Sequence, residues 1–154
     1  MRGTYWTRET RVIPASLPGE NDVSVRRELS APLQLSIHDY SVLGANVNGI
    51  TIFLFHGTTF NKYFWELVID YILSKPQLRQ IIKRRIALDA ANHGDSAVLS
   101  RAVLPIKGAC WADDSRDILH VIKTLEAKQP VLGIGHSFGG GAMQVSSPTE
   151  VDYR

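Results

Sequence analysis

One short stretch of the sequence has the residue types of an acyl-transfer site. Residues 133–141 read GIGHSFGGG, and within them Gly135 and Gly139 stand two positions before and after Ser137. This G-x-S-x-G pattern is typical of a sharp turn between a strand and a helix, which lifts a serine hydroxyl out of a sheet. The pattern therefore makes Ser137 a candidate nucleophile, and the alternative is a purely structural glycine-rich turn.

A serine nucleophile also needs two N–H donors that stabilise the oxyanion formed on a substrate carbonyl. The backbone N–H of Phe138 is the first candidate, because it follows the nucleophile directly. The second donor is expected in the loop after an earlier strand, where Thr58 is the first choice and Thr59 the second. The residues expected to support the site loops without reacting are His56, Gly57, Gly135, His136 and Gly139.

Other glycine-rich or metal sites fit the sequence less well. Gly133 and Gly135 begin a G-x-G, but position 138, where a dinucleotide-binding loop has its third glycine, is Phe. The sequence has no Gly-Lys-Ser/Thr phosphate loop. His56 and His93 precede glycines, yet no histidine–carboxylate spacing of the metalloprotease type is present. We expect neither a metal nor a cofactor.

The elements around these residues predict how they are positioned. Residues 50–55, 86–89 and 131–134 are short apolar runs, which are typical of strands buried on both faces. Helical apolar spacing separates them, and strands alternating with helices predict an α/β fold whose mostly parallel sheet has helices on both faces. The expected apolar faces are Phe64, Leu67, Val68, Tyr71 and Ile72 in the first helix and Ile118, Val121, Ile122 and Leu125 in the second.

Three loops follow the carboxyl ends of the predicted strands and should form the site together. They begin at His56, Ala90 and Gly135. Asp89 and Asp95 are expected to fix the second loop, which we predict to be polar and irregular, rather than to react. Asp113 or Asp114 is expected to cap the second helix.

The N-terminal region is predicted to be less regular. Prolines and a glycine interrupt residues 1–30, so we expect a loop with one short strand there. Residues 33–38 alternate apolar and polar side chains, and residues 44–49 have turn chemistry. The sequence therefore predicts a hairpin-like opening in which residues 33–38 and 50–55 are joined by this turn.

Composition excludes several classes of protein. The net charge of +2 is too small to indicate binding to nucleic acid or to an acidic membrane. The single cysteine, Cys110, excludes an internal disulfide, fits a reducing compartment and is expected to be buried. The N-terminus lacks the apolar stretch of a secretory signal, and no apolar run is long enough to span a membrane. The basic run Lys83–Arg85 is expected at a solvated helix end.

At this point the sequence resembles the α/β-hydrolase superfamily. The resemblance rests on residues 53–57 (FLFHG), on Asp89 with residues 93–96 (HGDS), and on residues 135–140 (GHSFGG). Their order and spacing are those of the first half of that domain. The resemblance implies a serine hydrolase with Ser137 as the nucleophile.

A narrower resemblance extends over residues 30–144. Residues 92–97 (NHGDSA) and 111–119 (WADDSRDIL) are similar to fungal peroxisomal lipase-like hydrolases and to AK-toxin-type hydrolases of Alternaria host-selective toxin clusters. This implies hydrolysis of a small-molecule ester, lipid or thioester, a step of toxin or secondary-metabolite biosynthesis and a peroxisomal location. The C-terminal residues are not of the S-K-L type, and a cytoplasmic location is the alternative.

The sequence departs from the family after the nucleophile. The triad of the family has the order Ser, Asp or Glu, His, but no histidine follows Ser137, and Glu150 and Asp152 are the only later acids. We expect a truncated hydrolase that ends just after the nucleophile elbow and is inactive alone. The alternatives are a non-catalytic module that pairs with itself or a paralogue through an open sheet edge, and a hydrolase that uses an upstream histidine. The predicted organisation is an extension over residues 1–30, half a hydrolase domain over 31–145 and a divergent tail over 146–154.

Overall fold

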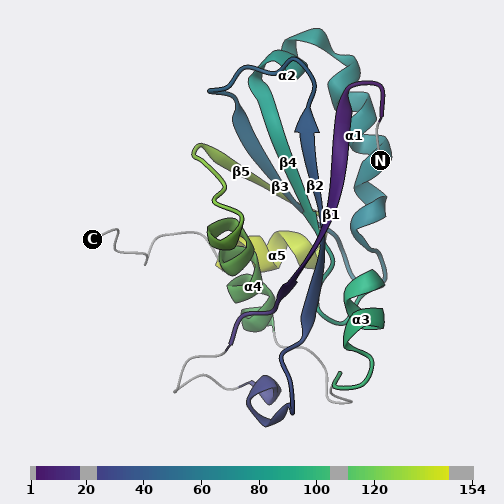
Figure 1. The fold of residues 1–154 in the computed structure, drawn as a ribbon, viewed down its shortest axis with the longest axis vertical. Coiled ribbons are helices and arrows are strands. Elements are labelled where there is room, and N and C mark those ends of the chain that lie inside the picture. Colours follow the sequence, from purple (N-terminus) through teal and green to yellow (C-terminus); the bar gives the residue numbers. More distant parts are fainter. Residues whose placement is uncertain (1–2, 18–23, 105–110, 146–154) are drawn as a thin grey trace, which may run out of the picture.

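The fold is seen in a computed structural model of the 154-residue chain, which describes residues 3–17, 24–104 and 111–145 (Figure 1). The expectations for Cys110 and for the tail over 146–154 lie outside these residues. Within the described residues a five-stranded sheet carries helices on its faces. This is the α/β architecture that the sequence predicts, a mostly parallel sheet with helices on both faces.

Four strands of the sheet run in one direction and one runs against them. The strand order is β1-β2-β4-β3-β5, in which β2 pairs antiparallel with β1 and β4, whereas β3 pairs parallel with β4 and β5. The three buried strands predicted from apolar runs are therefore neighbours: β4 and β3 lie inside the sheet, and β5 lies at its edge. The strands are β1 (Trp6–Pro14), β2 (Gln34–Val42), β3 (Ile50–Phe55), β4 (Ile82–Leu88) and β5 (Val131–Gly135).

Two apolar clusters cover the two faces of the sheet, because successive side chains of a strand point to opposite faces. Phe53 and Phe55 of β3 belong to the cluster under α4 and α5, and Ile52 and Leu54 belong to the cluster under α1. The helices are α1 (Trp65–Ser74), α2 (Pro76–Ile81), α3 (Gly94–Ser100), α4 (Trp111–Thr124) and α5 (Phe138–Val145), with 3-10 turns η1 (Val25–Glu28) and η2 (Lys62–Phe64).

Two expectations for the N-terminal region are wrong. The predicted hairpin of residues 33–38 with β3 does not form, because β4 lies between β2 and β3 in the sheet. The strand expected within residues 1–30 is not short: β1 has 9 residues and pairs along its length with β2. Residues 1–30 therefore contribute an edge strand to the sheet. The alternating apolar and polar side chains of β2 fit pairing with β3 as well as with β4, so the pattern does not determine which strand is its neighbour.

The apolar face predicted for the first helix is wrong except at Ile72, which packs against the core cluster. Leu67 and Tyr71 are 83% and 68% exposed. The buried side chains of α1 are instead Trp65, Ile69 and Leu73, which pack on the sheet. The helix carries two apolar stripes, and only the one that meets the apolar strands is covered.

The second predicted helix packs as expected. Ile118 and Val121 of α4 belong to the core cluster, as does Leu125 directly after the helix. However, α4 begins at Trp111, so Asp113 and Asp114 lie inside its first turn and are buried instead of capping it. Burial raises the pKa of Asp114 to about 7.

Two other local expectations are wrong. The basic run Lys83–Arg85 lies within β4, where Arg84 pairs with Asp39 and Arg85 is buried over the ring of Tyr40. The loop after β4 is shorter than predicted, because α3 begins at Gly94.

The position of α1 on the sheet gives a matched pair of substitutions. Ile69→Ala should lower the free energy of unfolding by about 2–5 kcal/mol, because it opens a cavity under α1. Leu67→Ala on the same helix should change it by less than about 0.5 kcal/mol, because Leu67 is exposed. Urea unfolding followed by circular dichroism measures both, and equal losses would contradict the packing of α1.

Candidate active site

Ser137 occupies a strained turn between β5 and α5. Its φ of 51° lies in the left-handed region, which non-glycine residues adopt only when the surroundings hold them there. Three backbone hydrogen bonds hold the turn: from His136 to the Phe55 carbonyl at 3.1 Å, from Gly139 to the His136 carbonyl at 2.9 Å, and from Gly140 to the Ser137 carbonyl at 2.9 Å. The Ser137 residue itself is exposed, so its hydroxyl is open to a substrate.

The two glycines that flank Ser137 lie where segments of backbone are in direct contact, so that a side chain would not fit. A Cβ on Gly135 would collide with the backbone of Gly139, and a Cβ on Gly139 would collide with the carbonyls of Phe55 and His56. The helix start is thus pressed against the carboxyl end of β3. Side chains at these positions would push the turn away from that strand.

The loop after β3 is a tight turn over residues 57–60. The amide of Phe60 donates to the carbonyl of Gly57 at 3.1 Å, and Thr59 has a φ of 70°. The amide of Thr59 donates to Nε2 of His93 at 3.3 Å, so it is occupied. The amide of Thr58 donates no hydrogen bond within the described part of the chain.

The loop and the elbow are in contact. A Cβ on Gly57 would collide with the His136 imidazole, so the backbone at residue 57 lies directly against the residue before Ser137. Phe138 is the first residue of α5, and an amide at that position has no carbonyl within its own helix. Neither the amide of Thr58 nor that of Phe138 therefore has a backbone acceptor within the described residues.

His56 is locked in one neutral tautomer. Its Nδ1 lies 2.8 Å from the carbonyl of Gly57 and therefore carries the proton, and its Nε2 accepts from the amide of Ala90 at 3.1 Å. Burial lowers the pKa of His56, which favours this neutral form. The 4.0 Å approach of Nε2 to Asp89 is therefore not an ion pair. His56 ties the loop after β3 to the loop after β4.

The second loop is organised around the buried carboxylate of Asp89. Its Oδ1 accepts from the Lys62 amide at 2.6 Å, and its Oδ2 accepts from Lys62 Nζ at 2.6 Å and from the Asp95 amide at 2.9 Å. Lys62 Nζ also binds Asp95 at 2.6 Å, and this bond lowers the pKa of Asp95. Gly94 has a φ of 50°, and a Cβ there would collide with the Asp89 carboxylate.

Aromatic rings flank the elbow on its two sides. The rings of Phe60 and Phe64 lie 5.4 and 5.3 Å from the His136 ring. The ring of Trp111 lies 5.4 Å from that of Phe138. Phe60, Phe64 and Trp111 are each at least one-third exposed, so apolar surface is available next to the serine.

The predicted site residues come together at one edge of the sheet, at the ends of β3 and β5. Two residues of the arrangement were not singled out from the sequence as parts of the site: Lys62, whose side chain is fully buried, and His93, which holds Thr59. No pattern marks Lys62, because its partners come from β4 and α3. The sequence-predicted residues found at this edge are His56, Gly57, Thr58, Gly135, His136, Ser137, Phe138 and Gly139.

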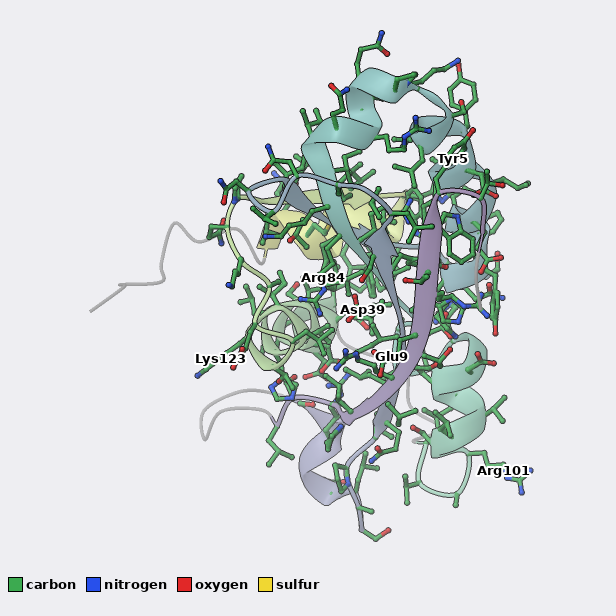
Figure 2. The ribbon with its side chains drawn as sticks, turned by 45° about the horizontal axis from the view of Figure 1, so that its top comes forward. Tyr5, Glu9, Asp39, Arg84, Arg101 and Lys123 are labelled. Atoms are coloured by element: carbon green, nitrogen blue, oxygen red, sulfur yellow. The ribbon has the colours of Figure 1, made fainter. Side chains whose placement is uncertain are left out.

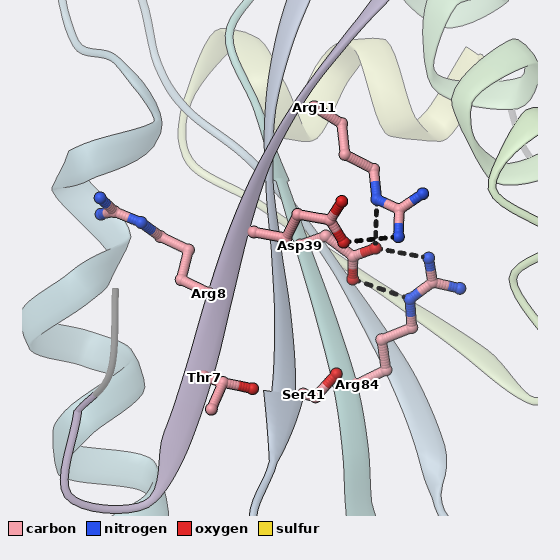
Figure 3. A pocket seen from close by; sticks show the side chains of 7 residues that line it. Thr7, Arg8, Arg11, Asp39, Ser41 and Arg84 are labelled. Carbon is pink, nitrogen blue, oxygen red and sulfur yellow. Dashed lines mark hydrogen bonds and ion pairs between the residues drawn. The ribbon is translucent and has the colours of Figure 1, made fainter.

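A polar groove lies elsewhere, across β1, β2 and β4. It has a volume of about 360 Å³, and ion pairs link its charged side chains, as Figure 3 shows for Arg11, Asp39 and Arg84. Figure 2 shows Glu9, Asp39 and Arg84 gathered over these strands. Because none of the groove residues belongs to the three strand-end loops, we do not connect it with the serine.

Within residues 3–17, 24–104 and 111–145, no group of three or more His, Cys, Asp or Glu side chains is arranged to hold a metal ion. No helix in the same residues is long and apolar enough to cross a membrane.

Comparison with known proteins decides the family. The sequence model of the alpha/beta hydrolase family matches residues 52–149, which include both site loops and the elbow. The chain belongs to the α/β-hydrolase family. In this molecule the matched residues form strands of the sheet with the order β1-β2-β4-β3-β5 and the turn after β5 that holds Ser137.

The most similar relatives include a yeast protein. The peroxisomal membrane protein LPX1 of Saccharomyces cerevisiae is 33% identical over 98 residues, which cover 59% of this chain and 25% of that protein. The solved structure of the peroxisomal alpha-beta-hydrolase Lpx1 from Saccharomyces cerevisiae has a TM-score of 0.76 at 25% identity and covers 96% of this chain and 42% of that one. This chain therefore spans less than half the length of that relative.

A more distant solved structure agrees in fold alone. Homoserine O-acetyltransferase from Staphylococcus aureus has a TM-score of 0.63 at 17% identity, covering 94% of this chain and 43% of that chain.

The glycines of this α/β-hydrolase elbow allow a sharp comparison. Gly139→Ala should destabilise the chain by about 1–3 kcal/mol, because the added Cβ collides with two carbonyls of the β3 end. Gly140→Ala is the control: its Cβ would sit 3.5 Å from the Gly135 carbonyl, an ordinary contact, and should leave stability unchanged or slightly higher. Thermal unfolding of the two variants tests this, and a more damaging Gly140→Ala would refute the close approach.

Proposed function

We propose that this chain carries the nucleophile and the oxyanion donors of a serine hydrolase. The observation that carries the proposal is the strained backbone of Ser137, which is exposed between β5 and α5. The amides of Thr58 in the adjoining loop and of Phe138 at the helix start have no acceptor within the described residues. In the proposed reaction the Ser137 oxygen attacks a substrate carbonyl. The Thr58 and Phe138 amides then stabilise the negative charge on the carbonyl oxygen.

Electrostatics at the elbow support the same role. Ser137 precedes the first turn of α5, and the amino end of a helix carries a partial positive charge that favours an oxyanion. His56 is held neutral, so it keeps its loop in place without adding a competing charge. These groups are set by the fold before any substrate binds, which is the arrangement that accelerates acyl transfer most.

The surface beside the serine favours a substrate with an apolar group. Phe60, Phe64 and Trp111 expose ring surface next to the turn. We therefore propose an ester, lipid or thioester whose acyl or alcohol part packs on these rings.

The described histidines do not fit the role of general base. Both ring nitrogens of His56 and of His93 are engaged in hydrogen bonds. His136 points against Gly57, and the 17 residues after Ser137 contain no histidine. We propose that the 154-residue chain alone turns over substrate negligibly, because losing the histidine of a serine triad costs on the order of a millionfold in kcat.

The biological setting is part of the proposal. The yeast relative carries the word peroxisomal in its name, and this supports a peroxisomal location for the present chain. A role in toxin or secondary-metabolite biosynthesis rests on the sequence resemblance of residues 92–97 and 111–119 to the toxin-type hydrolases.

The function is tested by supplying the base from outside. The purified chain should react with a fluorophosphonate probe no faster than Ser137→Ala, because the hydroxyl is not activated. Added imidazole should then hydrolyse a p-nitrophenyl ester faster than imidazole does without protein, an excess that Ser137→Ala lacks and that Ser41→Ala, a change of an exposed serine on β2, retains.

Two results would count against the proposal. Rapid labelling of Ser137 without imidazole would refute the inactive state of this chain. Imidazole-dependent hydrolysis that is the same in Ser137→Ala would refute the serine as nucleophile.

A second candidate function is favoured by the edge of the sheet. Within the described residues β5 pairs only with β3, and Leu132 on it is 50% exposed. An edge strand with unpaired backbone groups is a template for another strand. In this version the chain is a non-catalytic module that pairs through β5 with a second copy or a paralogue.

Substitution at the β5 edge tests the pairing. Leu132→Lys should convert a dimer into a monomer in size-exclusion chromatography with light scattering, because charge on an edge strand opposes pairing. Val12→Lys, a change of a half-exposed residue on the other edge strand, is the control and should keep the dimer. A monomeric wild-type chain at all concentrations would reject this candidate.

A further inference from the structure

A second histidine reaches across the site in the opposite direction to His56. His93 lies in the loop between β4 and α3, and its Nε2 accepts the amide of Thr59 at 3.3 Å. Its Nδ1 lies 2.6 Å from Oδ1 of Asn92, an acceptor, so Nδ1 carries the proton. His93 is thus fixed in the tautomer whose Nε2 has a free lone pair for the Thr59 amide.

The residue that His93 holds is a strained one. Thr59 is β-branched and has a φ of 70°, which such residues avoid unless their surroundings fix them. It is the third residue of the turn that the Phe60 amide closes on the Gly57 carbonyl. The hydrogen bond to His93 therefore acts on the peptide group that joins Thr58 to Thr59.

The two histidines form a reciprocal pair. His56 reaches from the β3 end to the Ala90 amide in the second loop, and His93 reaches from the second loop to the Thr59 amide in the first. Their rings lie 5.1 Å apart. Each accepts a backbone N–H through Nε2 and donates through Nδ1, so each must stay neutral to hold its loop.

The charges around His93 are few. His56 faces it from the end of β3 and Asp89 from the end of β4, and Asp89 is itself compensated by Lys62. Burial lowers the pKa of His93 from 6.5 and outweighs the opposing effect of Asp89. The neutral form that the Thr59 contact needs is thereby favoured at neutral pH.

We infer that His93 is a positioning residue of the oxyanion loop: it occupies the Thr59 amide, fixes the turn over residues 57–60, and leaves the Thr58 amide as the free donor beside Ser137. This inference rests on the proposed serine hydrolase function for the meaning of that donor. The link between His93 and the turn itself rests on the geometry of the two loops. His93 does not touch the reacting atoms in this role.

The link is tested by NMR on the 154-residue chain. The protection factor of the Thr59 amide against hydrogen exchange should fall about fivefold to tenfold in His93→Ala, because one net hydrogen bond is lost. His93→Gln, which can present an acceptor near the Nε2 position, should keep most of the protection. His120→Ala on α4 is the matched control and should leave it unchanged.

A pH titration of the wild-type chain needs no variant and keeps the test valid if His93→Ala does not fold. The protection factor of Thr59 should fall as the pH is lowered through the pKa of His93, since protonation of Nε2 removes the acceptor. In His93→Gln it should not change over the same range. Long-range ¹⁵N spectra of the imidazole should show Nδ1–H at pH 8.

The outcomes distinguish a failure of the His93 inference from a failure of the proposed serine hydrolase function. Thr59 protection that is the same in wild type, His93→Ala and His93→Gln at every pH overturns the inference. Protection that depends on His93 supports it. If that dependence holds but imidazole yields no Ser137-dependent hydrolysis, the serine hydrolase proposal fails while the loop contact stands.

Discussion

The carboxylate of Asp89 is a negative charge buried at the end of β4, and the site loops are arranged to compensate it. An unpaired buried carboxylate costs several kcal/mol, so its partners are fixed in place. The Lys62 amide and ammonium bind it from the first loop, and the Asp95 amide binds it from the start of α3. The Asp89 backbone donates to Ser36 of β2. The charge of Asp89 thus joins the two loops, and its backbone ties them to β2. Gly94 must be a glycine because any Cβ would enter this network.

The elbow depends on a different constraint, which is the absence of side chains. Gly135 and Gly139 let the turn lie against the end of β3, and the Phe55 carbonyl accepts the His136 amide at 3.1 Å. This contact couples the strain at Ser137 to the position of the first loop. The hydrogen bonds between Asp89 and Lys62 fix one end of that loop, and the elbow contacts the other end at Gly57. Together they fix the position of the turn over residues 57–60.

The sequence predicts the features that depend on local chemistry and misses those that depend on partners. The runs that became β3, β4 and β5 are apolar in any arrangement, and the G-x-S-x-G turn carries its own glycines. The placement of β4 between β2 and β3 is a long-range choice, and nothing in the turn over residues 44–49 indicates it. The face of α1 was chosen wrongly because its apolar residues form two stripes, and only the sheet decides which is covered. Lys62 and His93 acquire their roles from residues 27 to 34 positions away in the chain.

The separation of tasks within the site follows from these contacts. His56 and His93 at the strand ends accept hydrogen bonds from backbone amides through Nε2, and His136 packs against Gly57 of the first loop. Holding an oxyanion loop requires a neutral imidazole whose nitrogens are both engaged, whereas a general base requires a lone pair that is free to receive a proton. The same residue cannot do both at once. The imidazoles that hold the two site loops are therefore committed to backbone contacts and cannot serve as the base at the same time.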